Sequence, residues 1–223
     1  MSQGEKQKQK GSVGVFLILI LLASPVFSEG KTNFDTALQY FRNGAYGKAI
    51  VAFQHVVQDH PKSIKAYYNL GLCLLRENRY GEARSAFQQV VKLAPSGKLV
   101  HFYMGRTFYA EAKFREAQQE FEIALISYPE LAMVHHYLAL ALYHRGMLDT
   151  AIIHFQHAIT LRPQYAPAYY GLGFAFRAKR EAADSKRAFE KVVLLDRGGT
   201  LGLAAERILK VSGEKQPMEI PVE

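Results

Sequence analysis

The sequence predicts an all-α fold: a right-handed α-solenoid of about five helix-turn-helix units followed by a C-terminal capping helix. A phenylalanine recurs every 34 residues, at Phe53, Phe87, Phe121, Phe155 and Phe189, and such a period is typical of helical repeats. A small residue stands four positions before each one, at Ala49, Ala83, Ala117, Ala151 and Ser185. Between these columns, apolar residues recur at helical spacing, which favours two amphipathic helices in each unit.

The composition excludes several classes of protein. The chain has 223 residues, of which 49% are hydrophobic and 22% charged, as in ordinary globular proteins. Intrinsic disorder, a collagen-like structure and a disulfide-stapled miniprotein are therefore excluded. Cys73 is the single cysteine, so the chain cannot form an internal disulfide.

Residues 1–28 have the pattern of an export signal. Lys6, Lys8 and Lys10 precede the apolar stretch 13–23, and a small residue, Ser28, offers a cleavage site. The alternative is an uncleaved anchor in the inner membrane formed by residues 13–27, which are fewer than the ~20 residues that a spanning helix prefers. Both interpretations place the rest of the chain outside the cytoplasm, in the periplasm or the extracellular space.

The repeats divide residues 29–197 into five units: 30–63, 64–97, 98–131, 132–165 and 166–197. Glycine or alanine in each first helix lets two helices approach closely, and the phenylalanine fills the space beside it. These small residues are Ala37, Gly71, Gly105, Ala139 and Gly173. A proline ends the second helix of each of the first four units, at Pro61, Pro95, Pro129 and Pro163, and Ser63 and Ser96 are suited to cap the helices that follow.

These columns resemble the tetratricopeptide repeat (TPR) family, whose pattern combines an aromatic residue, Leu-Gly, Ala-x3-Phe and Pro. The resemblance covers about residues 30 to 197. The first aromatic position holds Tyr67 and Tyr169 in two units but departs from the pattern at Asn33, His101 and His135.

The segment after the repeats is predicted to close the solenoid. Residues 198–211 carry one apolar stripe beside charged residues, which indicates a capping helix over the last unit. Residues 212–223 resemble a flexible tail. Because this tail is extended, apolar and acidic, it is also a candidate occupant of the groove described next.

The resemblance implies a concave groove, lined by the first helix of each unit, that binds a peptide or a partner protein. Aromatic residues and arginine dominate the positions that would face it, as in binding hot spots. The alternative interpretation is that several of these side chains pack between neighbouring helices. The candidates are Phe34, Phe41, Arg42, Tyr68, Arg76, Phe102, Arg106, Tyr109, His136, Tyr143, His144, Tyr170, Phe174 and Arg177, with Leu38, Leu72, Leu75 and Leu140 beside them.

The groove does not resemble the carboxylate clamp of the family's chaperone-tail adaptors, which uses lysines and asparagines from successive first helices. Leucine, arginine or phenylalanine occupies the matching asparagine positions here, and only Asn69 resembles a clamp residue.

Histidines concentrate in the fourth unit, at His135, His136, His144, His154 and His157. His154 and His157 are spaced to share a helix face, as metal ligands do. No carboxylate or cysteine joins them at ligand spacing, so structural histidines are the favoured interpretation and we expect no cofactor.

The net charge of +8 favours anionic partners. Removal of residues 1–28 would leave +6, with a basic region in the fifth unit that could contact an anionic lipid or an envelope polymer. Most such charge runs are solvated helix faces. Nucleic acid is not an expected partner because the chain carries no known reading motif.

The sequence contains none of the common catalytic signatures, neither G-x-S-x-G, nor a phosphate loop, nor H-E-x-x-H. We therefore expect a non-catalytic scaffold or adaptor of the cell envelope that binds a protein or peptide partner. The alternative is a self-assembling structural subunit of an envelope, pilus or secretion complex, and a histidine-dependent metal-binding protein is less favoured. The sequence predicts neither the oligomeric state nor the identity of the partner.

Overall fold

The computed structural model describes residues 34–95 and 99–211. The chain divides into two units, 1–31 and 32–223, and only the second contains described residues. The predicted signal or anchor and the predicted tail 212–223 lie outside the described residues. Within the described ranges, no helix is both long enough and apolar enough to cross a membrane.

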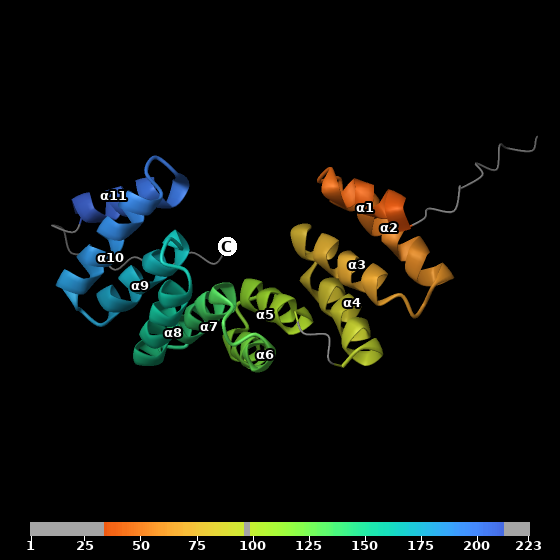
Figure 1. Ribbon diagram of the computed structural model, residues 1–223, viewed down its shortest axis with the longest axis horizontal. Helices are drawn as coiled ribbons and strands as arrows, with labels where there is room; N and C mark the ends of the chain where they lie inside the picture. Colours follow the sequence, from red (N-terminus) through yellow and green to blue (C-terminus); the bar gives the residue numbers. More distant parts are fainter. Residues whose placement is uncertain (1–33, 96–98, 212–223) are drawn as a thin grey trace, which may run out of the picture. The chain divides into compact units, whose positions relative to one another are not determined.

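The described residues form eleven α-helices and no strand (Figure 1). The first ten helices pack in adjacent pairs and the eleventh packs on the last pair, which confirms the predicted all-α solenoid with a capping helix. The helices are α1 (Phe34–Arg42), α2 (Tyr46–Asp59), α3 (Ile64–Arg76), α4 (Tyr80–Leu93), α5 (Val100–Ala110), α6 (Phe114–Ser127), α7 (Ala132–His144), α8 (Leu148–Leu161), α9 (Ala166–Ala178), α10 (Ala182–Leu195) and α11 (Thr200–Val211).

The first helices of the units share a surface that the second helices do not. Each helix packs against the next one, and in addition α1 contacts α3, α3 contacts α5, α5 contacts α7, and α7 contacts α9. In the part of the chain that the structure describes, no second helix touches another second helix. A partner lying on the first helices can therefore contact several units at once.

The phenylalanine column forms the core of every unit. Phe53, Phe87, Phe121 and Phe155 have no exposed side-chain surface, and Phe189 is 1% exposed. Glycine makes room for these rings, since a Cβ atom added to Gly71 or Gly105 would lie 2.5 Å from the ring of Phe87 or Phe121, respectively.

In the fourth unit, the glycine that packs against the core phenylalanine belongs to the next unit. Ala139 occupies the fourth unit's own small-residue position, and the Phe155 ring lies instead against Gly171 of α9, where an added Cβ would be 2.4 Å away. The fifth unit replaces the core alanine with Ser185, whose buried hydroxyl donates a hydrogen bond to the Gly173 carbonyl at 2.9 Å. Gly171 and Gly173 of α9 thus lie against the core rings of units four and five, respectively.

The turn inside each unit contains one residue with a left-handed backbone. These residues are Gly44, Asn78, Ala112, Gly146 and Arg180, with φ between 56° and 76°, and they recur at the repeat period. The N–H of the following residue reaches back to a carbonyl in the last turn of the first helix, as Arg79 N does to Leu74 O at 2.8 Å, which ends the helix.

Within residues 34–95 and 99–211, side chains cap two of the helix starts. Ser63 Oγ accepts a hydrogen bond from Ala66 N at 3.4 Å, as the sequence predicts, whereas Ser96 lies outside the described residues. Asp196 Oδ2 accepts hydrogen bonds from Leu201 N at 2.9 Å and Gly202 N at 3.0 Å, so this carboxylate starts the capping helix α11.

Candidate partner-binding surface

Aromatic rings follow one another across three successive first helices and the loop after α8. Tyr68 of α3 meets Tyr103 of α5 at 5.7 Å between ring centroids, and Tyr103 meets Phe102 at 5.1 Å. Phe102 then meets Tyr137 of α7 at 5.5 Å. His136 lies 5.3 Å from Tyr137 and 5.3 Å from Tyr165. We call Tyr68, Tyr103, Phe102, Tyr137, His136 and Tyr165 the aromatic ladder.

The ladder has a buried side and an accessible side. Phe102 and His136 are buried, whereas Tyr68, Tyr103, Tyr137 and Tyr165 are half-buried. Burial raises the pKa of Tyr68, and the neighbouring Tyr103 hydroxyl raises that pKa further. Half-buried tyrosines offer a large apolar ring together with a hydroxyl that can donate a hydrogen bond, a combination common in binding surfaces.

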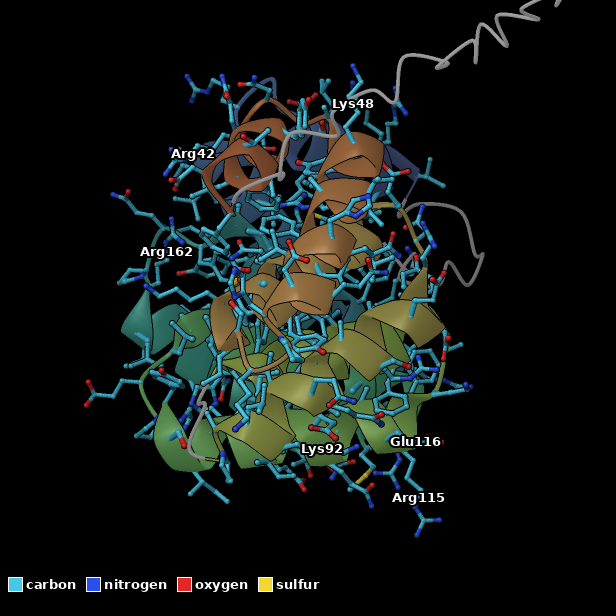
Figure 2. The ribbon with its side chains drawn as sticks, turned by 90° about the vertical axis from the view of Figure 1, so that its right-hand side faces the viewer. Arg42, Lys48, Lys92, Arg115, Glu116 and Arg162 are labelled. Atoms are coloured by element: carbon cyan, nitrogen blue, oxygen red, sulfur yellow. The ribbon has the colours of Figure 1, made fainter. Side chains whose placement is uncertain are left out.

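Two arginines lie over rings of the ladder. The Arg106 guanidinium of α5 is 5.3 Å from the centroid of Tyr137 and 6.0 Å from that of Phe102. The Arg162 guanidinium is 5.3 Å from the centroid of Tyr165. Arg162 belongs to the loop between α8 and α9 and projects outward from the ribbon in Figure 2.

Tyr165 and His136 of the ladder are neutral near pH 7. Burial raises the pKa of Tyr165 to about 12, and the neighbouring Tyr137 hydroxyl adds to this shift, while Arg162 and Arg106 oppose it. Burial lowers the pKa of His136 to about 3. The positive charge of this region therefore comes from the two guanidinium groups.

The structure separates the fourteen residues predicted for the groove by their burial. Phe102, Tyr109, His136 and Phe174 are buried and pack between helices. Arg42 and Arg76 are exposed in the last turns of α1 and α3. The remaining eight are half-buried: Phe34, Phe41, Tyr68, Arg106, Tyr143, His144, Tyr170 and Arg177.

Several predicted groove residues contact the core of their own unit or a neighbouring unit. Phe34 meets the core ring of Phe53 at 5.6 Å. His144 stacks on Phe114 at 4.4 Å, and its Nε2 lies 3.1 Å from the Tyr109 hydroxyl oxygen. In the ladder, Tyr68 and Phe102 of the predicted surface each meet a ring of the next unit, and the ladder's tyrosines keep exposed area.

Sequence reasoning missed four residues of this region: Tyr103, Tyr137, Tyr165 and Arg162. Tyr103 and Tyr137 stand one repeat period apart, so the same column comparison that revealed the phenylalanines could have found them. Tyr165 and Arg162 lie in a loop, and their counterparts in other units are of different types, so no periodic signal indicates them.

The unit-four histidines split into three groups. His136 belongs to the ladder and His144 packs on Phe114. His135, His154 and His157 come together, with ring centroids 5.3 to 6.3 Å apart, and His135 Nδ1 lies 3.0 Å from His154 Nδ1. Among residues 34–95 and 99–211, no three His, Cys, Asp or Glu side chains are arranged to hold a metal ion.

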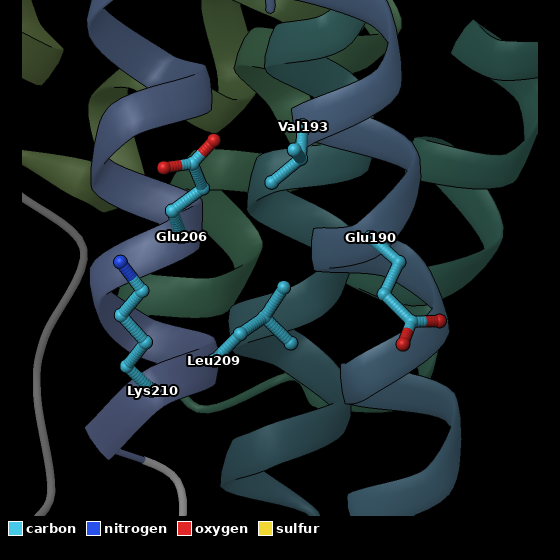
Figure 3. A pocket seen from close by; sticks show the side chains of 5 residues that line it. All are labelled: Glu190, Val193, Glu206, Leu209 and Lys210. Carbon is cyan, nitrogen blue, oxygen red and sulfur yellow. The ribbon is translucent and has the colours of Figure 1, made fainter.

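Two further features lie apart from the ladder. Burial raises the pKa of the Cys73 thiol to about 12, so the thiol is protonated and poorly nucleophilic. An open pocket of about 360 Å³ between α10 and α11 is lined by Glu190, Val193, Glu206, Leu209 and Lys210 (Figure 3).

Comparison with known proteins agrees with the fold. A tetratricopeptide repeat family model matches residues 34–98 and 104–166. No sequence among curated proteins matches the chain significantly.

Solved structures share the fold at low sequence identity. MamA (residues 41 to the end) from Desulfovibrio magneticus RS-1 is 21% identical, with a TM-score of 0.70 over 77% of this chain and 98% of that one. YrrB, described as a TPR protein with an unusual peptide-binding site, is 17% identical, with a TM-score of 0.65 over 80% of this chain and 94% of that one. Since the repeat model matches more than half of its residues, the chain belongs to the tetratricopeptide repeat family.

Proposed function

We propose that this protein is a non-catalytic scaffold that holds a segment of a partner protein against the aromatic ladder. The repeat fold supports this proposal, because proteins of this family are generally scaffolds that bind proteins or peptides. The observation that carries it is the run of half-buried tyrosines from Tyr68 to Tyr165, which crosses helices that belong to different units.

The geometry suits an extended segment. An extended chain advances ~3.3 Å per residue, so a short peptide can span rings that follow one another at 5 to 6 Å. Tyrosine and arginine are enriched in hot spots because they provide large contact areas and directional donors. Rings already packed against one another also lose little conformational freedom when a partner binds.

We propose that binding takes place outside the cytoplasm, in the cell envelope. The lysines and apolar stretch of residues 1–28 support export, either with cleavage after Ser28 or with residues 13–27 as an anchor. Cell fractionation followed by N-terminal sequencing tests this. A protein recovered from the cytosol with its first residue intact would contradict export.

In-cell photocrosslinking tests the partner surface. A photoreactive phenylalanine analogue placed at Tyr68 or Tyr137 should crosslink a partner, and the same analogue at the exposed second-helix residues Gln88 or Arg115 should not. Mass spectrometry then identifies the partner and the segment bound.

Partner binding is then measured with two matched triple variants. The first is Tyr68→Ala/Arg106→Ala/Tyr137→Ala on the ladder. The second, Lys48→Ala/Gln88→Ala/Arg115→Ala, removes exposed side chains from second helices. Circular dichroism melting confirms that both fold. Equal partner affinity for the two variants would contradict the proposed surface.

Self-assembly is a second candidate function, favoured by exposed aliphatic residues on the second helices. Ile126 is 83% and Leu194 59% exposed, and they occupy equivalent positions two repeat periods apart. Sedimentation equilibrium should then show association that Ile126→Ser/Leu194→Ser weakens. A wild-type monomer at all concentrations would contradict this candidate.

A further inference from the structure

The positive charge on the ladder lacks a counterion within the described residues. Arg79, Arg84 and Arg187 form ion pairs with Glu82, Glu111 and Asp184. Arg106 and Arg162, in contrast, form no ion pair within residues 34–95 and 99–211, and both guanidinium groups lie over aromatic rings.

These two arginines, which are far apart in the sequence, belong to one cluster. Arg106 covers Tyr137 and Arg162 covers Tyr165, and both tyrosines contact the same His136 ring at 5.3 Å. The charges of Arg106 and Arg162 both act on the Tyr165 hydroxyl. Units three and four and the loop into unit five thus contribute to a single basic and aromatic region.

The buried His136 makes this region unusual. Its Nδ1 atom is buried and has no hydrogen-bond partner among residues 34–95 and 99–211, and its ring contacts Tyr137, Phe155 and Tyr165. Because its pKa is lowered to about 3, His136 contributes no charge near pH 7. The neutral His136 ring lies between Tyr137 and Tyr165, the two rings over which the guanidinium groups of the arginines lie.

We infer that the partner segment presents an acidic side chain, Asp or Glu, to Arg106 and Arg162 beside the Tyr165 hydroxyl. This inference rests on the proposed function and adds the chemistry of the segment. A guanidinium held over a ring keeps its N–H edge free to fork onto a carboxylate. Such charge-assisted bonds are shorter and stronger than neutral hydrogen bonds.

The surroundings of the arginines favour a peptide over a small anion. The ladder continues from Tyr137 through Phe102 and Tyr103 to Tyr68, which offers apolar ring surface that phosphate cannot use. The segment should therefore combine an acidic residue with apolar residues on the side that faces Tyr68.

An array of blocked peptides tests the inference with the full-length protein. The probes are N-acetylated, C-amidated dodecapeptides that combine apolar residues with one central Glu, each synthesised again with Gln in place of Glu. Fluorescence polarisation should give about tenfold tighter binding for the Glu peptide than for its Gln twin, and the preference should shrink at high salt.

Charge variants assign the preference to the two arginines. Arg162→Gln changes an exposed loop side chain and should reduce the Glu-to-Gln ratio to about one, as should Arg106→Gln. Arg106→Lys keeps the charge, so it guards against a packing effect and should retain part of the preference. The exposed second-helix variant Arg115→Gln is the matched control and should leave the ratio unchanged.

The outcomes separate this inference from the proposed function. Suppose that the wild type binds Glu and Gln peptides equally well and the Tyr68→Ala/Arg106→Ala/Tyr137→Ala variant binds neither. The ladder would then remain the binding surface, but the inference of an acidic side chain would be overturned. If a Gln peptide with a free C-terminal carboxylate bound as tightly as the blocked Glu peptide, the assignment of the acidic group to a side chain would be overturned. Complete displacement by millimolar inorganic phosphate would indicate a simple anion site. Failure of every peptide to bind would overturn both proposals.

Discussion

The Nδ1 atoms of His135 and His154 lie 3.0 Å apart, and His135 Nε2 lies 2.9 Å from the Pro129 carbonyl oxygen. Since a carbonyl only accepts, His135 Nε2 carries a proton and donates it to Pro129. His135 Nδ1 then accepts from the Nδ1–H of His154, so the pair is held together while both imidazoles are neutral. In the preceding unit, His101 and Glu120 occupy the same two positions, 2.7 Å apart.

Acid should destabilise the fold through this pair. Burial lowers the pKa of His154 to about 4 and also lowers the pKa of His135. His157 opposes protonation of both, and Glu122 favours that of His154. The unfolded chain binds these protons near pH 6.5 and the folded chain only at lower pH. Stability is thus complete above about pH 6.5 and should fall by ~1–2 kcal/mol toward pH 4, as measured by urea unfolding at several pH values.

The variant His154→Glu should weaken or reverse this acid dependence. A carboxylate beside His135 reproduces the His101–Glu120 pair and favours the protonated imidazole, so stability near pH 5 should rise relative to the wild type. The surface variant His60→Gln serves as the control for loss of a histidine. Identical pH slopes for wild type and His154→Glu would rule out this role of the pair.

The substitution Gly71→Ala should destabilise the protein by ~1–3 kcal/mol, because the added Cβ would lie 2.5 Å from the buried Phe87 ring. Gly47→Ala is the matched control: it lies in α2 with nothing within 4 Å of the added Cβ, and a helical alanine should raise stability by ~0.5–1 kcal/mol. Thermal or urea unfolding measures both. Similar effects of the two changes would argue against tight packing at Gly71.

Ala112→Gly should stabilise the turn between α5 and α6. Ala112 has φ of 56°, a left-handed conformation that costs a residue with a Cβ ~1–2 kcal/mol. Because glycine also loses more chain entropy on folding, we expect a net gain of ~0.5–1 kcal/mol in the free energy of unfolding. The reverse change, Gly44→Ala at φ of 72°, should cost about as much, and a loss of stability in Ala112→Gly would contradict the expectation.

Asp196→Ala should loosen the capping helix. The Asp196 carboxylate accepts the N–H groups of Leu201 and Gly202 at the start of α11, and loss of such a cap costs ~1 kcal/mol. Asp196→Asn keeps an acceptor and should retain most of this stability. Hydrogen exchange, read on the amides of α11, should show faster exchange in the alanine variant alone. Unchanged exchange there would exclude Asp196 as the cap.

The repeat columns predict the fold well because packing between helices depends on residue size at fixed positions. Phe87 and Gly71 are recognisable in the sequence because the ring needs a small residue beside it, and the phenylalanine and Gly/Ala columns recur in every unit. The left-handed residues at the turns were not predicted as a column, because Gly44, Asn78, Ala112 and Arg180 share a backbone conformation rather than a residue type.

The exposure of the candidate groove residues was predicted less well than the fold, for a physical reason. Register places Phe102, Tyr109, His136 and Phe174 on first helices, but whether such a ring stays exposed depends on the neighbouring unit, and all four are buried. Arg162 and Tyr165 lie in a loop whose path depends on tertiary contacts, so no helical periodicity reveals them. The contact between His135 and His154 likewise joins residues of two different helices, α7 and α8.

Contacts in the described chain join helices no more than two apart along the sequence. In such a structure each unit is stabilised by its neighbours, and the two ends of the repeat array make no direct contact. A partner segment lying across α3, α5 and α7 would contact three units at once and so couple units that otherwise interact only through their neighbours. The complex should therefore unfold more cooperatively, in a sharper transition, than the free protein.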